Sequence, residues 1–421
     1  MHQRRSFLKV AGAGMASLVA PLSRLRADDK PTRSNADDNR SAGGSVRTPK
    51  PAIAPPLIGH DPGSLLAHEA VDTAITGALA WRVRYVSKDV HGVQHEASGL
   101  VIAPKARGAN RKILTWCHGT TGLGDAGCPS AQPDPARELI TYFSPQATQQ
   151  IDYGIPGLQG FIDDGWVVCA TDYQGLGTPG MHQYMVNRTQ ARDAVYIAHT
   201  SRRLDAGAGT TLGCMGWSQG GGAAAAVAEL DADDYGDLKL VGTVPMSPGV
   251  AAIVLNEPPG LLAILTNSSG PPDSHLVMML AGTQVANHAT LNLSDVFTPL
   301  GIEIIENVWN TQPIHHLNDT TARLFRLKGP VTLRQPLNFE KWSQAISAGS
   351  AATRKPVAPV LACIDSFAGG TAVPVPLQTA YVNKVKELGG SVEVREYPHD
   401  DHFSLPQSCV APARAWLNRL S

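Results

Sequence analysis

The chain has 421 residues, of which 43% are hydrophobic and 17% charged, and its formal net charge is −1. This length is enough for one large or two modest domains with a sizeable core. The near-neutral charge provides no basic excess for binding nucleic acid. The sequence also lacks a run of about eighteen apolar residues, which a membrane-spanning helix would need.

The first 27 residues resemble an export signal. The pair Arg4 and Arg5 is followed by "SFLK" and by a mildly apolar stretch rich in Gly and Ala. This pattern is typical of the twin-arginine route, with cleavage expected after Ala27 and a periplasmic or secreted product. The alternative is a basic start to an ordinary helix. Residues 28–56 are polar and rich in Pro and Gly, which predicts a flexible leader, and no lipid-anchor cysteine precedes it.

Beyond the leader, the hydrophobic pattern alternates between strands and helices. In chain order it predicts two strands in 81–104 around a His91-Gly92 turn, strands at 111–119 and 166–173, a helix at 190–204, a strand at 210–216, a helix at 221–230, strands at 238–248 and 357–365, a helix at 377–389, a strand at 391–398 and a helix at 412–420. This alternation favours an α/β fold with a mostly parallel central sheet and helices on both faces.

Residues 249–356 interrupt the alternation. They contain several helix-like pieces and loops but no strand–helix–strand unit, and they are too long for a plain connection in a compact domain. We therefore predict an inserted, mainly helical lid or cap, with the sheet domain formed by 57–248 and 357–421. The apolar stretches of this insertion fit either a cover over a lipid-binding cleft or simple core packing.

The sequence "TTLGCMGWSQGGGAAAAVAEL" places G-x-S-x-G, residues 216–220, between a predicted strand and a predicted helix. This is the context of a nucleophile elbow, in which a strained turn presents a serine above the sheet. Side chains two residues before and after the serine would clash in such a turn, and glycine removes them. The N-terminus of the following helix favours negative charge that develops at the site. We therefore predict Ser218 as the nucleophile.

A nucleophilic serine needs a general base, and the base needs a carboxylate that orients it. The chain order Ser, Asp, His is typical of a nucleophile elbow, so the base should follow the last predicted strand. His399 and His402 both lie in that loop. We favour His402, with His399 as the alternative. The alternatives for the same residues are a solvated loop without a catalytic role and a metal site on "HDDH".

The orienting acid should follow the penultimate strand. Asp365 ends that strand and is the only carboxylate between Lys355 and Glu387, so we predict it as the acid. Asp400 and Asp401 are the second choice. They lie next to His402 in the sequence, and a carboxylate so close in sequence rarely points correctly at the imidazole.

An oxyanion hole needs two backbone N–H donors. The first is predicted to be the N–H of Gln219, directly after the nucleophile. The second should come from "TWCHGTTG", which follows the strand at 111–119, and Thr120 is the best candidate there. An ordinary Gly-rich turn is the alternative for this stretch.

Four motifs in this order, "HGTTG" with "CPS" shortly after, "TDYQGLGTPG", "GWSQGGG" and "YPHDDHF", resemble the secretory lipase family of α/β-hydrolases. This group includes the lipase A type from yeasts and related bacterial lipases and esterases, and the resemblance spans roughly residues 80–420. It implies an α/β-hydrolase fold with a lid over the serine and no cofactor, and it implies the same roles for Ser218, Asp365, His402, Thr120 and Gln219.

The resemblance carries further expectations. It implies that Asp172 braces loops near the site and that Cys363 and Cys409 form a C-terminal disulfide, whereas Cys128 has no evident partner. The sequence departs from the family in the loop that contains the acid. This loop usually reads G-x-x-D-x-x-V-P, but here Gly370 stands at the position of the aspartate. The loop is therefore expected to be remodelled, with Asp365 nearer the strand end.

No cofactor or metal is expected. There are two G-x-G-x-x-G matches, at 122–127 and 175–180. The first is followed by Pro-rich sequence rather than by the helix that dinucleotide binding requires, and the second contains Pro179 within the motif. The sequence thus predicts an exported serine hydrolase that cleaves carboxylic esters, such as lipids or acylglycerols, through an acyl-enzyme. The alternatives are an acyltransferase with the same three residues, a serine peptidase, and an inactive binding protein.

Overall fold

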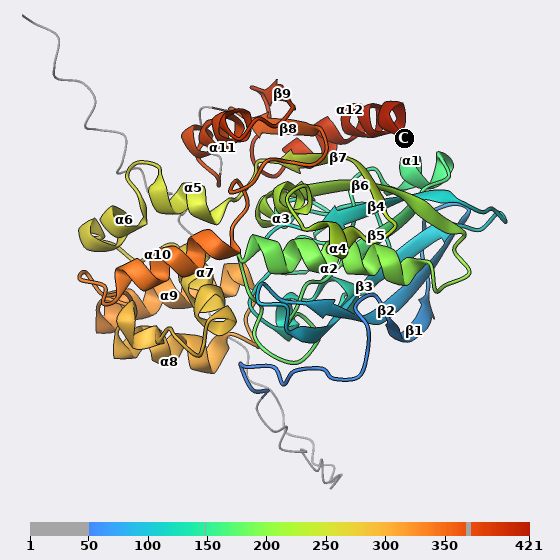
Figure 1. The fold of residues 1–421 in the computed structure, drawn as a ribbon. Helices are drawn as coiled ribbons and strands as arrows, with labels where there is room; N and C mark the ends of the chain where they lie inside the picture. Colours follow the sequence, from blue (N-terminus) through green and yellow to red (C-terminus); the bar gives the residue numbers. More distant parts are fainter. Residues whose placement is uncertain (1–49, 148, 368–371) are drawn as a thin grey trace, which may run out of the picture. The chain divides into compact units, whose positions relative to one another are not determined.

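A nine-stranded sheet forms the centre of the computed structural model, which describes residues 50–147, 149–367 and 372–421 (Figure 1). Its strands are β1 (Leu65–Val71), β2 (Ala78–Lys88), β3 (Gln94–Pro104), β4 (Arg111–Cys117), β5 (Val167–Thr171), β6 (Ala208–Trp217), β7 (Lys239–Met246), β8 (Val360–Asp365) and β9 (Val392–Tyr397). The predicted signal, 1–27, and most of the predicted leader, 28–49, lie outside the described residues.

The strand order is β1-β2-β3-β5-β4-β6-β7-β8-β9. The first three strands are antiparallel, and β5 pairs antiparallel with β3 but parallel with β4. All pairs from β4 to β9 are parallel, so the predicted mostly parallel sheet is confirmed. The predicted hairpin turns where Gly92 N donates to Asp89 O at 3.0 Å, and Gly92 adopts a φ of 80° that glycine allows. The strand β1 was not predicted.

Helices cover both faces of the sheet, as predicted. One apolar cluster packs α2 (Asn187–Ser201), α3 (Gln219–Val227) and α11 (Val375–Glu387) against one face. A second cluster packs α1 (Leu158–Asp163) and α12 (Leu405–Leu420) against the other face. The short helix α4 (Ala232–Tyr235) follows α3.

The last helix begins earlier than the sequence indicated. The sequence predicts a helix at 412–420, but α12 starts at Leu405 and contains Pro412 within it. A proline inside a helix removes one backbone hydrogen bond. Here Cys409, Ala413 and Trp416 are buried against the sheet on either side of it, and this burial outweighs the lost bond.

The segment between β7 and β8, which contains most of the predicted insertion, is helical in the structure. It contains α5 (Ala251–Asn256), α6 (Leu261–Asn267), α7 (Ser274–Ala286), α8 (Pro299–Val308), α9 (Ile314–Lys328) and α10 (Phe339–Gly349). These helices share a hydrophobic cluster, which includes Leu280, Ile305, Leu317 and Trp342. Loop residues of the sheet domain belong to the same cluster: Leu123, Met181, Tyr184 and Met185. In Figure 1 they form the yellow and orange group beside the sheet. Whether this group acts as a lid stays a prediction.

Two buried polar side chains of the sheet domain hold both ends of the insertion. The Asn187 side chain accepts hydrogen bonds from Ala251 N at 3.4 Å and Ala351 N at 3.3 Å. The carboxylate of Glu229 accepts from the backbone N–H groups of residues 352–354 at 2.8–3.1 Å. The segments where the chain enters and leaves the insertion are both bonded in this way. They therefore lie in fixed positions next to α2 and α3.

The two Gly-rich loops pack against each other and against residues 50–56, the end of the predicted leader. Met181 N donates to Ala52 O at 2.7 Å. Asp125, in the first loop, accepts from Lys50 Nζ at 2.5 Å and from Gly177 N, in the second loop, at 3.1 Å. A Cβ on Gly175 would lie 2.5 Å from a backbone nitrogen. Close packing of loops therefore accounts for glycine here.

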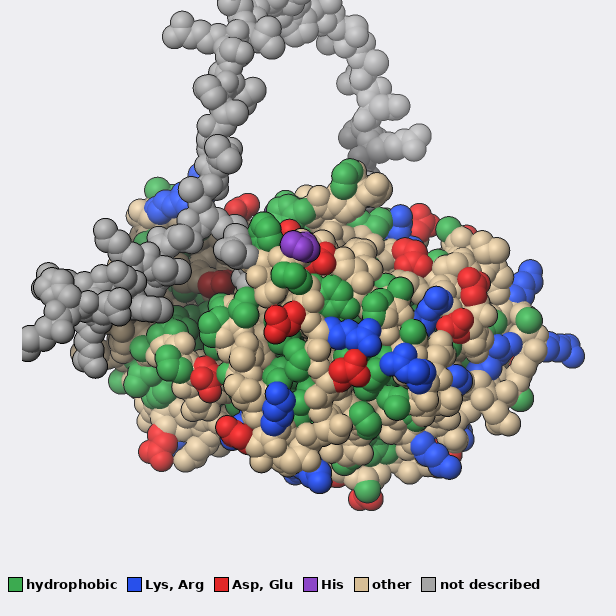
Figure 2. All heavy atoms as spheres, turned by 90° about the horizontal axis from the view of Figure 1, so that it is seen from above, with side chains coloured by type: hydrophobic (Ala, Val, Ile, Leu, Met, Phe, Trp, Pro, Cys, Tyr) green, Lys and Arg blue, Asp and Glu red, His purple; other side chains and the backbone are tan. Residues whose placement is uncertain are grey.

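The face of the molecule seen in Figure 2 has interspersed Lys, Arg, Asp and Glu side chains rather than a patch of one sign. Within the described part of the chain, no helix is both long enough and apolar enough to cross a membrane.

Candidate active site

Ser218 lies in the sharp turn between β6 and α3. Its backbone has φ 60° and ψ −120°, a strained conformation for a residue with a side chain. A Cβ on Gly216 would lie 2.0 Å from Gly220 O, and a Cβ on Gly220 would lie 2.0 Å from Cys117 O. Backbone therefore occupies the space on both sides of the turn, which is why the motif requires glycine at these two positions.

The turn is fixed by the end of the neighbouring strand β7. Ser218 N donates to Met246 O at 2.9 Å, and Gly249 N donates to Ser218 O at 2.8 Å. The Ser218 side chain sits in a largely enclosed place, since the residue is 8% exposed. A serine held in a strained turn by its own backbone is suited to present its hydroxyl in one direction.

His402 lies in the loop after β9 and is buried. The indole Nε1 of Trp217, the residue before Ser218, donates to His402 O at 2.9 Å. The two rings are 5.1 Å apart between centroids. His399, the alternative base, is exposed. The structure therefore brings His402, and not His399, against the turn that contains Ser218.

Asp365 is the last residue of β8 and is fully buried. Its Oδ2 lies 3.4 Å from His402 Nδ1, and its Oδ1 accepts a hydrogen bond from Gln378 Nε2 on α11. Burial by itself raises the pKa of the Asp365 carboxyl, but the nearby His402 ring, and to a smaller extent Ser247 and Gln378, outweigh burial and lower this pKa below its ordinary value. Asp365 is therefore ionised at neutral pH.

The fallback acids are engaged elsewhere. Asp401 Oδ1 accepts from Phe403 N at 3.0 Å and from Ser404 N at 2.8 Å, and Asp400 accepts from Ser408 Oγ at 2.6 Å. Both carboxylates thus stabilise the start of α12, where unpaired N–H groups attract negative charge.

Sequence reasoning missed two polar neighbours of the Asp365–His402 pair. Ser247 Oγ lies 3.0 Å from His402 Nδ1, and Gln378 Nε2 reaches Asp365 Oδ1 and also donates to Val373 O at 2.7 Å. Ser247 directly follows the β7 strand, and a polar residue at a strand end was the signal available for it. Nothing in the sequence pattern of α11 distinguishes Gln378.

The two predicted oxyanion residues flank the same turn. Gln219 is the first residue of α3, so its N–H has no acceptor in a preceding helical turn. Thr120 is buried in the loop after β4, with its Oγ1 2.8 Å from Tyr184 OH. A Cβ on Gly119 would lie 2.7 Å from the Trp217 ring, so this loop lies close against the residue before the serine.

A neutral histidine orients the Gln219 side chain. Gln219 Nε2 lies 2.6 Å from His182 Nε2, while His182 Nδ1 lies 2.8 Å from Gln174 O. Burial is the main cause that lowers the pKa of His182 to about 3. The ring therefore stays neutral at physiological pH, donates from Nδ1 and accepts the Gln219 amide at Nε2.

Asp172, which the family resemblance implied as a loop brace, bonds three segments. Its Oδ1 accepts from Ser130 N at 2.8 Å, and its Oδ2 accepts from Ser130 Oγ at 2.5 Å and Ser98 Oγ at 2.7 Å. These bonds link the end of β5 to β3 and to the loop that follows β4. All the Asp172 contacts are structural ones.

An aromatic group borders His402 on one side. Phe403 lies 5.6 Å from the His402 ring and 4.8 Å from Phe143, whose side chain is 65% exposed. Next to it, Tyr142 stacks on His315 of α9 with ring centroids 3.8 Å apart. The sheet domain and the insertion together thus supply an apolar, partly exposed surface beside the base.

Residues 141–253 match the family model of secretory lipases. This segment contains "GWSQGGG", and the predicted resemblance to secretory lipases is confirmed. The match supports a carboxylic ester hydrolase of the lipase and esterase class. A search of curated protein sequences finds no match.

Solved structures with the same fold include two ester hydrolases. The rice cell wall degrading esterase LipA from Xanthomonas oryzae has a TM-score of 0.64 at 19% identity, over 86% of this chain and 100% of that one. Candida antarctica lipase A in its closed state has a TM-score of 0.62 at 13% identity, over 86% of this chain and 82% of that one. At these identities the likeness establishes the fold, which is the predicted α/β-hydrolase fold.

The cysteines are all buried free thiols in the structure, including Cys363 and Cys409. Burial, and then the neighbouring Cys363 thiol, raise the pKa of Cys409 well above its ordinary value. The disulfide that the family resemblance implied between these two residues is not formed here, and it stays a prediction.

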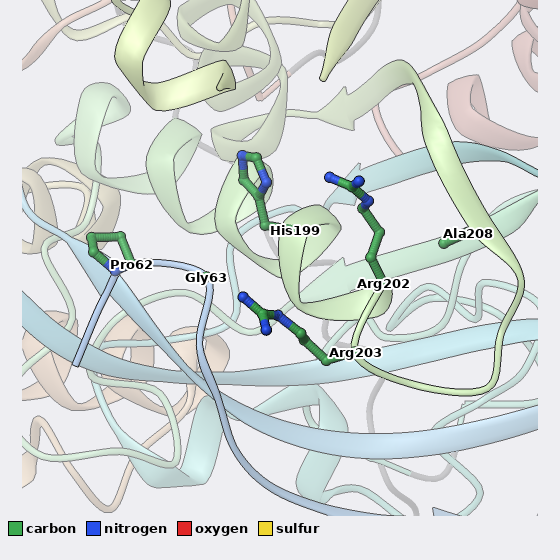
Figure 3. Close-up of a pocket in the computed structure, with 6 residues that line it drawn as sticks. All are labelled: Pro62, Gly63, His199, Arg202, Arg203 and Ala208. Carbon is green, nitrogen blue, oxygen red and sulfur yellow. The ribbon is translucent and has the colours of Figure 1, made fainter. Parts of the chain in front are cut away.

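A basic cavity lies at the end of β6 opposite to Ser218. It measures about 450 Å³ and is lined by His199, Arg202 and Arg203, with Pro62, Gly63 and Ala208 (Figure 3). It contains no nucleophile, and Arg202 is paired with Asp237 at 2.6 Å. The cavity also adjoins the C-terminal end of α2, where the helix dipole disfavours an anion.

Within the described ranges, no group of three or more His, Cys, Asp or Glu side chains is placed to hold a metal ion. The "HDDH" segment, the candidate for such a site, has His399 exposed, His402 against Asp365, and both aspartates bonded at the start of α12.

Proposed function

We propose that the protein is an exported serine hydrolase that cleaves carboxylic esters through an acyl-enzyme on Ser218. The observation that carries the proposal is the buried contact of Asp365 Oδ2 with His402 Nδ1, 3.4 Å apart, held against the strained turn of Ser218. The match to secretory lipases supports the same chemistry. Export by the twin-arginine route, through the Arg4–Arg5 pair, is part of the proposal.

In the first half-reaction, Ser218 Oγ attacks the ester carbonyl carbon. His402 takes the serine proton at Nε2, because its Nδ1 faces Asp365 and Ser247. The ionised Asp365 stabilises the imidazolium that forms. When the tetrahedral intermediate collapses, the C–O bond to the alcohol breaks and His402 returns the proton to the leaving oxygen.

The carbonyl oxygen becomes negative in the intermediate. The N–H groups of Gln219 and Thr120 are the donors proposed for it, and the N-terminus of α3 adds a favourable dipole. Each such donor contributes roughly 3 kcal/mol in the transition state. In the second half-reaction, water attacks the acyl carbon while His402 takes a proton from it. The bond from that carbon to Ser218 Oγ then breaks, His402 returns the proton to Oγ, and the carboxylic acid leaves.

The aromatic group beside His402 supports a substrate with an apolar acyl or aryl part. Phe143 and Phe403 present ring surface at the base, and Phe143 is largely exposed. Burying this surface against an apolar substrate would be favourable by about 25 cal/mol per Å² removed from water.

The test is hydrolysis of a p-nitrophenyl ester series from acetate to palmitate, by the wild type and by Ser218→Ala. Ser201→Ala is the matched control, since it also removes a buried serine hydroxyl, at the end of α2 and away from the site. We expect Ser218→Ala to lose at least about 1,000-fold in kcat and the control to stay within twofold. Equal activity of wild type and Ser218→Ala, or none in either, would refute the proposal. The preferred chain length separates a lipase from a small-ester esterase.

A further inference from the structure

The polar group closest to His402 Nδ1 on the acid side is a hydroxyl rather than the carboxylate. Ser247 Oγ lies 3.0 Å from Nδ1, whereas Asp365 Oδ2 lies 3.4 Å from it. A charge-assisted N–H···O bond is usually about 2.7–2.9 Å long. Asp365 Oδ2 accepts no hydrogen bond from the described residues. The acid and the base are thus close but not directly bonded.

Ser247 belongs to a short segment that contacts all three parts of the site. Ser247 N donates to Cys363 O at 2.9 Å, on the strand that ends in Asp365. The residue before it, Met246, accepts from Ser218 N, and Gly249 donates to Ser218 O. One end of β7 therefore sets the nucleophile, the acid strand and the base in register.

The backbone of Ser247 is held in an unusual conformation that directs its side chain. Its φ is 43°, and the residue is fully buried. Positive φ is uncommon outside glycine, and among other residues Asn and Asp tolerate it best. A buried serine in such a conformation is constrained by its surroundings, and here its oxygen is at hydrogen-bond distance from the imidazole.

A hydroxyl can accept one hydrogen bond and donate another at the same time. We propose that Ser247 is a positioning residue that joins His402 to Asp365. It accepts the Nδ1–H of His402 and turns its own O–H toward the ionised Asp365 carboxylate, without a hydrogen bond to Oδ2 in the structure. No bond forms or breaks at Ser247 during the reaction, and it keeps its proton. It holds the ring so that Nε2 faces Ser218, and it transmits the negative charge of Asp365 to the imidazolium.

This inference rests on the proposed function of Ser218, Asp365 and His402, and its test uses the same ester assay. Ser247→Ala removes the hydroxyl, and Ser247→Gly removes it while permitting the positive φ. We expect both variants to lose about 10- to 100-fold in kcat with KM within twofold, as for a hydrogen bond to a charged group. The matched control is Thr243→Val on the same strand, because the Thr243 hydroxyl is buried and unpartnered.

A rescue experiment separates positioning from general packing. In the double variant Asp365→Asn with Ser247→Asp, the carboxylate moves to position 247, where Asp suits the backbone. We expect its kcat to exceed that of Asp365→Asn alone by at least about 10-fold, since a carboxylate at position 247 lies within reach of Nδ1. A residue that only fills space would give no such recovery.

The outcomes distinguish this inference from the proposed function. The role of Ser247 is overturned if Ser247→Ala or Ser247→Gly keeps the wild-type kcat, or if the double variant is no faster than Asp365→Asn. If Ser218→Ala is inactive in the same assay, the serine mechanism stays intact. Activity in Ser218→Ala overturns both. Melting temperatures of the Ser247 variants are measured alongside, so that kcat is compared only among folded proteins.

Discussion

Gly220 is the position at which a single methyl group tests the geometry of the nucleophile turn. In Gly220→Ala, the new Cβ would lie 2.0 Å from Cys117 O, 2.4 Å from Cys117 C and 2.5 Å from His118 O. Carbon and oxygen atoms that are not bonded need more than 3.0 Å. Because every obstacle is backbone at the end of β4, no side chain can rotate away. The start of α3 must therefore move by about 1 Å, and Ser218 and Gln219 move with it.

Two consequences follow from that displacement. Overpacking of a closed site costs about 1–3 kcal/mol in the free energy of unfolding, and the backbone obstacle places this variant near 3 kcal/mol. For a unit that spans Pro49–Ser421, this lowers the melting temperature by roughly 4 °C. The same movement misplaces the nucleophile and one oxyanion donor, and a displacement of that size costs about 100-fold in kcat.

Thermal unfolding followed by circular dichroism and p-nitrophenyl ester kinetics measure both effects. Gly270→Ala is the matched control, because a Cβ there meets nothing within 4 Å and the backbone is not in the left-handed region. We expect the control to match the wild type in both assays. If Gly220→Ala keeps the wild-type melting temperature within 1 °C and kcat within twofold, the close approach of α3 to β4 does not constrain the site, and the reasoning fails.

Three further predictions concern the acid, the pH dependence and export. Asp365→Asn should lower kcat by about 10,000-fold, whereas Asp401→Asn should stay within a few-fold in the same ester assay; the reverse order would make Asp401 the acid. The pKa of His182 is about 3 in the folded protein, against about 6.5 in the unfolded chain. Between these two values the unfolded chain binds more protons, so the free energy of unfolding should fall as pH drops through this window. Denaturant titrations should show a shallower fall in His182→Gln, and equal slopes would contradict the buried neutral ring. Replacing both Arg4 and Arg5 by Lys should leave the precursor in the cytoplasm, as seen by immunoblotting of cell fractions, and unchanged export would exclude the twin-arginine route.

Much of the fold was predictable because it depends on local pattern. The parallel strands β4, β5, β6, β7 and β8 lie where short apolar runs predicted them. The G-x-S-x-G turn was evident because strand, glycines and helix follow one another within about twenty residues. The strand β1 was not predicted, since its residues are mostly exposed and carry no clear alternation. The predicted start of α12 at residue 412 was too late, because tertiary burial extends this helix back to Leu405 and keeps Pro412 inside it.

The order of the motifs along the chain was enough to name Ser218, Asp365 and His402 as candidates, because each lies at or after the end of a strand in a parallel sheet, where side chains converge. The sequence by itself thus determined the α/β class, the nucleophile turn and the resemblance to secretory lipases. Only the tertiary structure decided which groups meet: His402 rather than His399 against Asp365, Gln378 behind the acid, and Ser247 beside the His402 ring. Ser247 and His402 are 155 positions apart. Contacts over such separations depend on strand register and loop conformation, which the periodicity of apolar residues does not encode.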